Sequence, residues 1–132
     1  MLGVLVLAGV ASAGWLAVHR AASDTDAARS ATDSFLHDLE SSDYPGAYRL
    51  LTSDAQAVMT EAVFARTIQG QPRHVRGHSI DGVNSSAVHP RTYVAVFVQV
   101  TFTDGGMSPF TIGVLPQGGH WRVRSEPFWG LP

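Results

Sequence analysis

The sequence predicts an α+β domain preceded by a hydrophobic helix. Three observations lead to this: an uncharged apolar run near the N-terminus, a first half with apolar residues at helical spacing, and a second half in which they alternate. Helices followed by consecutive antiparallel strands predict about three helices packed on one face of a sheet of about four strands. The chain of 132 residues has room for one domain, placed at residues 21–132 after an appendage at residues 1–20.

The N-terminal appendage is expected to be a membrane anchor. Residues 2–18 carry no charge, and as a helix they would be about 25 Å long, just enough to span a bilayer. Trp15 suits the membrane interface, and Arg20 ends the run. A cleaved signal peptide stays open, because residues 11–13 (Ala-Ser-Ala) have the small-x-small cleavage form, and so does a buried helix. We expect a single-pass membrane protein with an extracytoplasmic domain or, if the segment is cleaved, a secreted one.

Helical spacing predicts a first helix from Ser23 to about Glu40. Ser23 and Asp26 have the form of a capping box, in which two side chains satisfy free backbone N–H groups at a helix start. The apolar residues that recur at this spacing are Ala28, Ala31, Phe35 and Leu39.

Shorter helical segments are predicted to follow. Pro45 suits an early helical position. A second capping box, Ser53 with Gln56, begins an apolar stripe with an expected break at Thr60, and Gly70 ends it. The stripe comprises Val58, Val63, Phe64 and Ile68.

Beyond Arg73 the apolar period changes to two, which predicts strands. The clearest strand covers residues 92–103, with turn signals at 104–106 and 116–119 bounding the next. A fainter strand covers about 73–83, and residues 84–86 are expected to punctuate it. One face of the long strand is apolar and comprises Val94, Val96, Val98, Val100 and Phe102. We expect this face to meet Phe35, Leu39, Phe64 and Ile68.

The opposite face mixes aromatic and arginine residues. It is a candidate interface for a homodimer or a membrane protein partner, and a plain solvated face is the alternative. Arg122 and Arg124 alternate together on the last strand, where they could clamp an anion or meet the acidic helical half of a partner, with plain solvation as the simpler interpretation. An apolar tail, residues 128–132, either folds over the sheet or docks onto another protein. The candidate interface residues are Tyr93, Phe97, Arg122, Arg124 and Trp129.

Composition weighs against several functions. The net charge is −2 and the nine basic residues are too few for a dense basic patch, so no nucleic-acid partner is expected. The absence of Cys excludes disulfides, thiolate nucleophiles and Cys metal sites. His74 and His78 would lie about 13 Å apart on a strand, too far to share an ion. No metal and no other cofactor is therefore expected.

Few residues suggest chemistry. Asp33 and His37 stand four apart on the first helix beside Asp38, and could form an acid–base pair. An exposed acidic helix face is the simpler interpretation, so no catalytic residue is assigned. Tyr44 and Tyr48 are candidates to line a pocket, with packing against the core as the alternative.

Two stretches resemble the nuclear transport factor 2-like superfamily: residues 41–51 (SSDYPGAYRLL) and residues 118–123 (GGHWRV). The resemblance covers residues 24–126 by element order, and implies three helices wrapped on a curved antiparallel sheet, a cystatin-like cone that often encloses a pocket. Anchored members similar to Mce-associated proteins are extracytoplasmic accessory proteins of Gram-positive bacteria. Others are isomerases, dehydratases and epoxide hydrolases, whose catalytic sets do not map onto this chain.

These features together lead to one functional expectation and one alternative. We expect a membrane-anchored, non-enzymatic accessory or interaction domain. The alternative is a small-molecule binding protein, or an isomerase- or dehydratase-type enzyme, that uses the cone pocket.

Overall fold

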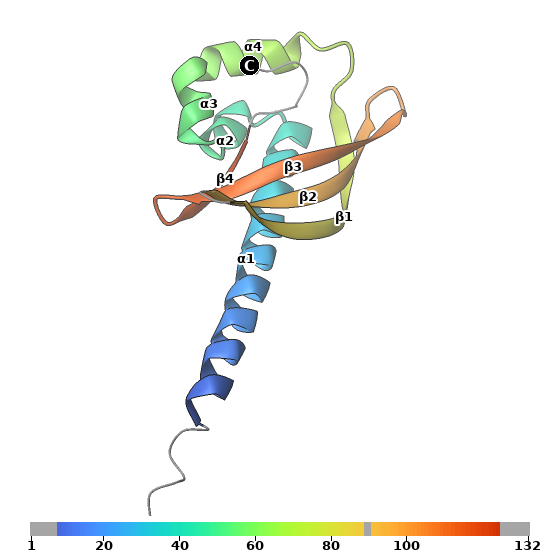
Figure 1. Ribbon diagram of the computed structural model, residues 1–132. Helices are drawn as coiled ribbons and strands as arrows, with labels where there is room; N and C mark the ends of the chain where they lie inside the picture. The colour runs from blue at the N-terminus through green and yellow to red at the C-terminus, as the bar shows by residue number, and fades with distance from the viewer. Residues whose placement is uncertain (1–7, 89–90, 125–132) are drawn as a thin grey trace, which may run out of the picture.

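A computed structural model describes residues 8–88 and 91–124 of the chain, as four helices followed by four strands (Figure 1). The helices are α1 (Ala8–Glu40), α2 (Tyr44–Arg49), α3 (Ser53–Val58) and α4 (Glu61–Gln69). The strands are β1 (Val75–Val88), β2 (Arg91–Phe102), β3 (Met107–Gln117) and β4 (His120–Val123). The predicted α+β class is confirmed.

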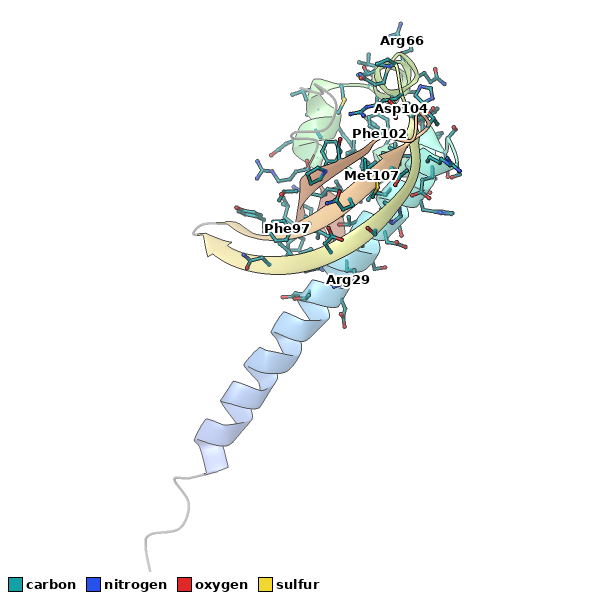
Figure 2. The ribbon with its side chains drawn as sticks, turned by 90° about the vertical axis from the view of Figure 1, so that its right-hand side faces the viewer. Arg29, Arg66, Phe97, Phe102, Asp104 and Met107 are labelled. Carbon is teal, nitrogen blue, oxygen red and sulfur yellow. The ribbon has the colours of Figure 1, made fainter. Side chains whose placement is uncertain are left out.

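The strands form one antiparallel sheet in the order β1-β2-β3-β4. Sequence neighbours are therefore sheet neighbours, and the sheet curves strongly when seen from the side (Figure 2). The predicted turn at 104–106 is present, and the second is shorter than predicted, because Pro116 and Gln117 belong to β3 and only residues 118–119 form the turn. Gly105, Gly118 and Gly119 adopt φ of 83°, 59° and 78°, a region that costs glycine little.

The inner face of the sheet packs against the helices as predicted. Val94, Val96, Val98, Val100 and Phe102 are all buried, and they share one cluster with Phe35, Leu39, Phe64 and Ile68. Burying one such side chain contributes roughly 1.5–3 kcal/mol. This cluster holds the second half of α1 and the short helices on one side of the sheet, and none of the described helices covers the other side. The apolar tail, residues 128–132, lies outside the described residues.

The short helices are capped close to the predicted positions. Thr52, rather than Ser53, is the N-cap of α3 and accepts a hydrogen bond from the Ala55 N–H. Thr60 caps α4 in the same way, which confirms the predicted break. The predicted stripe was partly wrong: Val58 and Val63 are 64 % and 39 % exposed, and the buried positions are Ala55, Met59, Phe64 and Ile68. The break at Thr60 rotates α4 relative to α3, so one helical stripe cannot run through both.

The predicted start of a helix at Ser23 is wrong, because Ser23 lies inside α1. A capping box needs a non-helical residue at the N-cap, and the alanine-rich sequence on both sides of Ser23 favours an unbroken helix. The described residues include no helix long and apolar enough to cross a membrane. Residues 2–7 of the predicted anchor lie outside the described part of the chain.

Strand β1 is longer than predicted. The polar residues 84–86 do not end it, because they pair with residues 95–93 of β2. Bulges at Arg76 and Asp81 interrupt this ladder, and they explain the faint alternation in the sequence.

Candidate functional site

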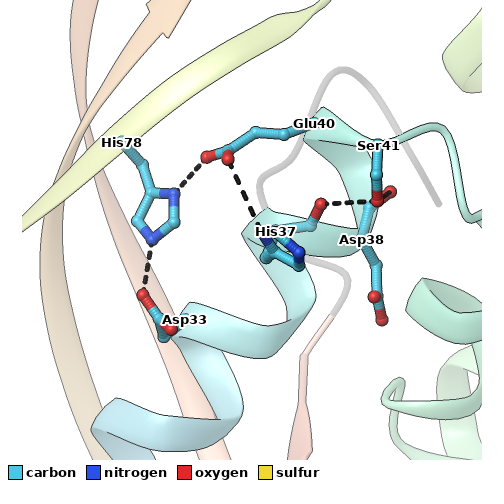
Figure 3. Close-up of polar contacts among 6 residues, drawn as sticks. All are labelled: Asp33, His37, Asp38, Glu40, Ser41 and His78. Atoms are coloured by element: carbon cyan, nitrogen blue, oxygen red, sulfur yellow. Dashed lines mark hydrogen bonds and ion pairs between the residues drawn. The ribbon is translucent and has the colours of Figure 1, made fainter.

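An imidazole held between two carboxylates joins α1 to β1 (Figure 3). His78 of β1 approaches Glu40 through Nδ1 and Asp33 through Nε2, the latter at 2.8 Å. The His78 side chain is only 10 % exposed, whereas that of Asp33 is 63 % exposed. Glu40 and Asp33 lie two turns apart on α1, and His78 reaches both because its strand position opposite Val100 faces the helices.

The geometry sets the charge of this imidazole. An ionised carboxylate can only accept hydrogen bonds, so an imidazole that contacts one at each nitrogen must carry both protons. Burial alone would lower the pKa of His78, but its hydrogen bonds with Glu40 and Asp33 and their charges outweigh burial and raise that pKa above its usual value. The Glu40–His78–Asp33 triplet is therefore a charged link between helix and strand.

A shallow groove of about 450 Å³ borders this triplet, lined by residues of α1 and β1 that include Arg29, Asp33 and His78. Both ring nitrogens of His78 are occupied, so His78 can act as an acid or base toward a molecule in the groove only if Asp33 turns away. The described residues contain no group of three or more His, Asp or Glu arranged to hold a metal ion.

The predicted acid–base residues have other partners in the structure. Asp33 bonds to His78, and His37 Nδ1 lies 3.9 Å from Glu40 Oε2. Asp38 approaches the start of α2, where burial and the negative charge of Asp43 raise its pKa, against the opposing charges of His37 and Arg49. These groups order the end of α1, and no substrate site follows from them.

The two tyrosines proposed for a pocket pack against the core. The Tyr48 hydroxyl donates to the carbonyl oxygens of Met59 and Gln56, at 2.8 and 3.3 Å, and the Tyr48 ring lies 5.9 Å from that of Phe64. Tyr44 is half-buried beside the same cluster. Tyr48 therefore ties α2 to the end of α3.

The outer face of the sheet gathers several of the proposed interface residues. Tyr93 lies under the Arg124 guanidinium, whose carbon is 5.9 Å from the ring centroid, and Phe97 is 41 % exposed. The outer positions of β2 and β3 carry no charge and comprise Tyr93, Ala95, Phe97, Gln99, Thr101, Met107, Pro109, Thr111, Gly113 and Leu115. We call this set the outer face. Trp129 lies outside the described residues.

Arg122 and Arg124 contact different parts of the molecule. Arg122 Nη1 donates to the carbonyl oxygen of Arg49 at the end of α2, while Arg124 lies over the outer face. The segment after α2 pairs with β4, since the Thr52 N–H donates to the Val123 carbonyl at 2.9 Å and the Val123 N–H donates to the Leu50 carbonyl at 2.7 Å. This pairing brings Arg49 beside Arg122.

Comparison with known proteins provides no relative. No family model, curated protein or solved structure shows a significant match to the chain. The sequence interpretation also missed Glu40 and Arg49, since each acts on a residue far along the chain. One sequence signal could have placed His78 on the helix side of the sheet. It lies two residues before Ile80 on β1, so both side chains point to the same face, and Ile80 packs against the core.

Proposed function

We propose that this chain is a membrane-anchored, non-enzymatic interaction domain with a fold of the nuclear transport factor 2-like kind. The order of elements, with helices on one face of a curved antiparallel sheet, supports the fold assignment. The packing of three fully buried rings, Phe35, Phe64 and Phe102, supports an interaction role over an enzyme with an interior cone pocket. These rings fill space between the helices and the sheet where such a pocket would lie.

The tether is the apolar run at residues 2–18. Helix α1 continues from this run into the domain, as far as Glu40. A continuous helix would hold the domain at a defined distance from the bilayer, because its rise of about 1.5 Å per residue is fixed. In the anchored form, α1 therefore connects the membrane segment rigidly to the domain. We propose that the domain lies on the extracytoplasmic side.

The observation that carries the interaction role is the uncharged outer face. Phe97 and Met107 on this face are 41 % and 64 % exposed, and its ladder of paired residues from Val94 to Thr101 is unbroken. Exposed aromatic and methionine side chains are typical of the central part of protein interfaces, and Arg124, which lies over Tyr93, would belong to the rim. A face that only met water would gain solubility from charged residues at these positions.

The partner we propose is a second copy of the chain. An uncharged face can oppose itself across a two-fold axis without like-charge repulsion. With that axis parallel to the strands, the β1 edge bearing Asp81 would meet the β4 edge bearing Arg124 of the other copy. Four strands of about eight residues cover roughly 500 Å², below the about 800 Å² per partner of a standard interface. Confinement by the membrane anchor raises the effective concentration and offsets this deficit.

Substitution of Phe97 by glutamate tests this role. We expect the full chain in mild detergent to be dimeric by light scattering and Phe97→Glu to be monomeric, because two buried carboxylates would face each other near the axis. Val58→Glu is the matched control, since Val58 is equally apolar and is 64 % exposed on α3. A monomeric parent chain, or a dimer that survives Phe97→Glu, would refute the proposed partner.

A further inference from the structure

A trough of about 510 Å³ lies between α1, the end of α2 and β4, on the helix side of the sheet edge. One wall is formed by the small side chains of Ala27, Ala31 and Ser34, whose spacing of four and then three residues places them on one face of α1. The other walls are aromatic and basic. The residues that form these walls include Ala27, Ala31, Ser34, Arg49, Trp121 and Arg122. The volume is within the range of small-molecule sites.

The ionisable side chains that line this trough are all basic. Two arginines and His120 line it, and the described lining residues include no Asp or Glu. The Arg122 guanidinium is fixed in place, because it donates to the backbone carbonyl of Arg49. A guanidinium has five N–H donors, and the bond to the Arg49 carbonyl uses only one of those of Arg122.

The trough also has an apolar part. Trp121 is partly buried against the core and lines the trough, as do Ala27 and Ala31 on α1. An aromatic side chain among small ones is suited to contact a flat apolar group. A ligand that fits both features has an anionic head and an apolar body.

We propose that the α1–β4 trough binds a small organic anion, a carboxylate or phosphate monoester on an aromatic or short aliphatic body. Arg49 and Arg122 bind the anionic head through charge-assisted hydrogen bonds, and Ser34 offers a hydroxyl to the same head. Trp121 covers the apolar body. This site is separate from the outer face, so it could be occupied in a monomer or a dimer.

Phenyl phosphate is a suitable probe, titrated by calorimetry into the full chain in detergent. We expect phenyl phosphate to bind more tightly than inorganic phosphate, which lacks the apolar body, or phenol, which lacks the charge. Arg122→Gln and Arg49→Gln should each weaken binding about tenfold or more, because each removes a charge-assisted contact. Arg49→Gln keeps the backbone carbonyl that holds Arg122, so it separates loss of charge from loss of structure.

Arg66→Gln is the matched control, because Arg66 lies on α4 (Figure 2) and is not among the residues that line the trough. It should leave the affinity for phenyl phosphate unchanged. Failure of phenyl phosphate to bind at millimolar concentration, or equal affinity in Arg122→Gln, Arg49→Gln and Arg66→Gln, would overturn the proposal. Melting temperatures of all three variants show whether any lost binding reflects unfolding.

Discussion

Replacing Phe64 by alanine is expected to destabilise the domain by about 3–5 kcal/mol, the usual range for removing a buried phenylalanine. Phe64 is fully buried, and its ring packs on that of Tyr48 at 5.9 Å between centroids. Helix α4 has only nine residues, so this ring is a main contact that holds it on the domain. The free energy of unfolding, measured by urea denaturation of the full chain, gives the effect directly.

Val63→Ala is the control for this substitution. Val63 precedes Phe64 on the same helix but is 39 % exposed, so its replacement should cost less than about 1 kcal/mol. If both variants lost equal stability, α4 would not be held by the buried ring, and the description of the core would need revision.

Removing the His78 imidazole is expected to cost about 2 kcal/mol at a pH where this ring is protonated, the range for hydrogen bonds to charged groups. Its folded-state pKa lies above the usual value of 6.5, so folding favours the protonated form. The stabilisation is therefore complete below pH 6.5 and is lost as the pH rises through the raised pKa. The difference in unfolding free energy between the parent chain and His78→Gln should shrink over that interval.

Glu40→Gln separates charge from hydrogen bonding at this link. The amide can still accept from Nδ1, but it lacks the charge that favours the imidazolium, so the pKa of His78 should fall. NMR titration of the His78 ring in the parent chain and in Glu40→Gln measures its pKa in both. A His78 that titrates at or below its usual pKa in the parent chain would contradict the paired arrangement.

The fold was largely predictable because its main signal is local. Alternation from Val94 to Phe102 and helical spacing up to Leu39 are properties of neighbouring residues, and both sets pack in the core, with Ala31 only partly buried. Boundaries were less predictable. Ser23 could have capped a helix, but the alanine-rich sequence around it continues α1. Residues 84–86 could have ended a strand, but they pair with β2 and extend β1.

The candidate sites were much less predictable, because they depend on contacts between distant segments. Thirty-eight positions separate Glu40 from His78, and seventy-three separate Arg49 from Arg122. The local pattern paired Asp33 with His37 and Arg122 with Arg124, since each pair is close along its own element. Pairing of β1 and β4 with their neighbours decides which side chains actually meet.

Cross-linking in membranes tests the central claim, that the domain is anchored and associates through the outer face. The chain contains no cysteine, so Phe97→Cys carries a single thiol for a short bismaleimide. We predict a covalent homodimer in carbonate-washed membranes for Phe97→Cys and none for Val58→Cys. Recovery of the chain in the soluble fraction, equal cross-linking of both variants, or attachment of Phe97→Cys only to a different protein would contradict the account.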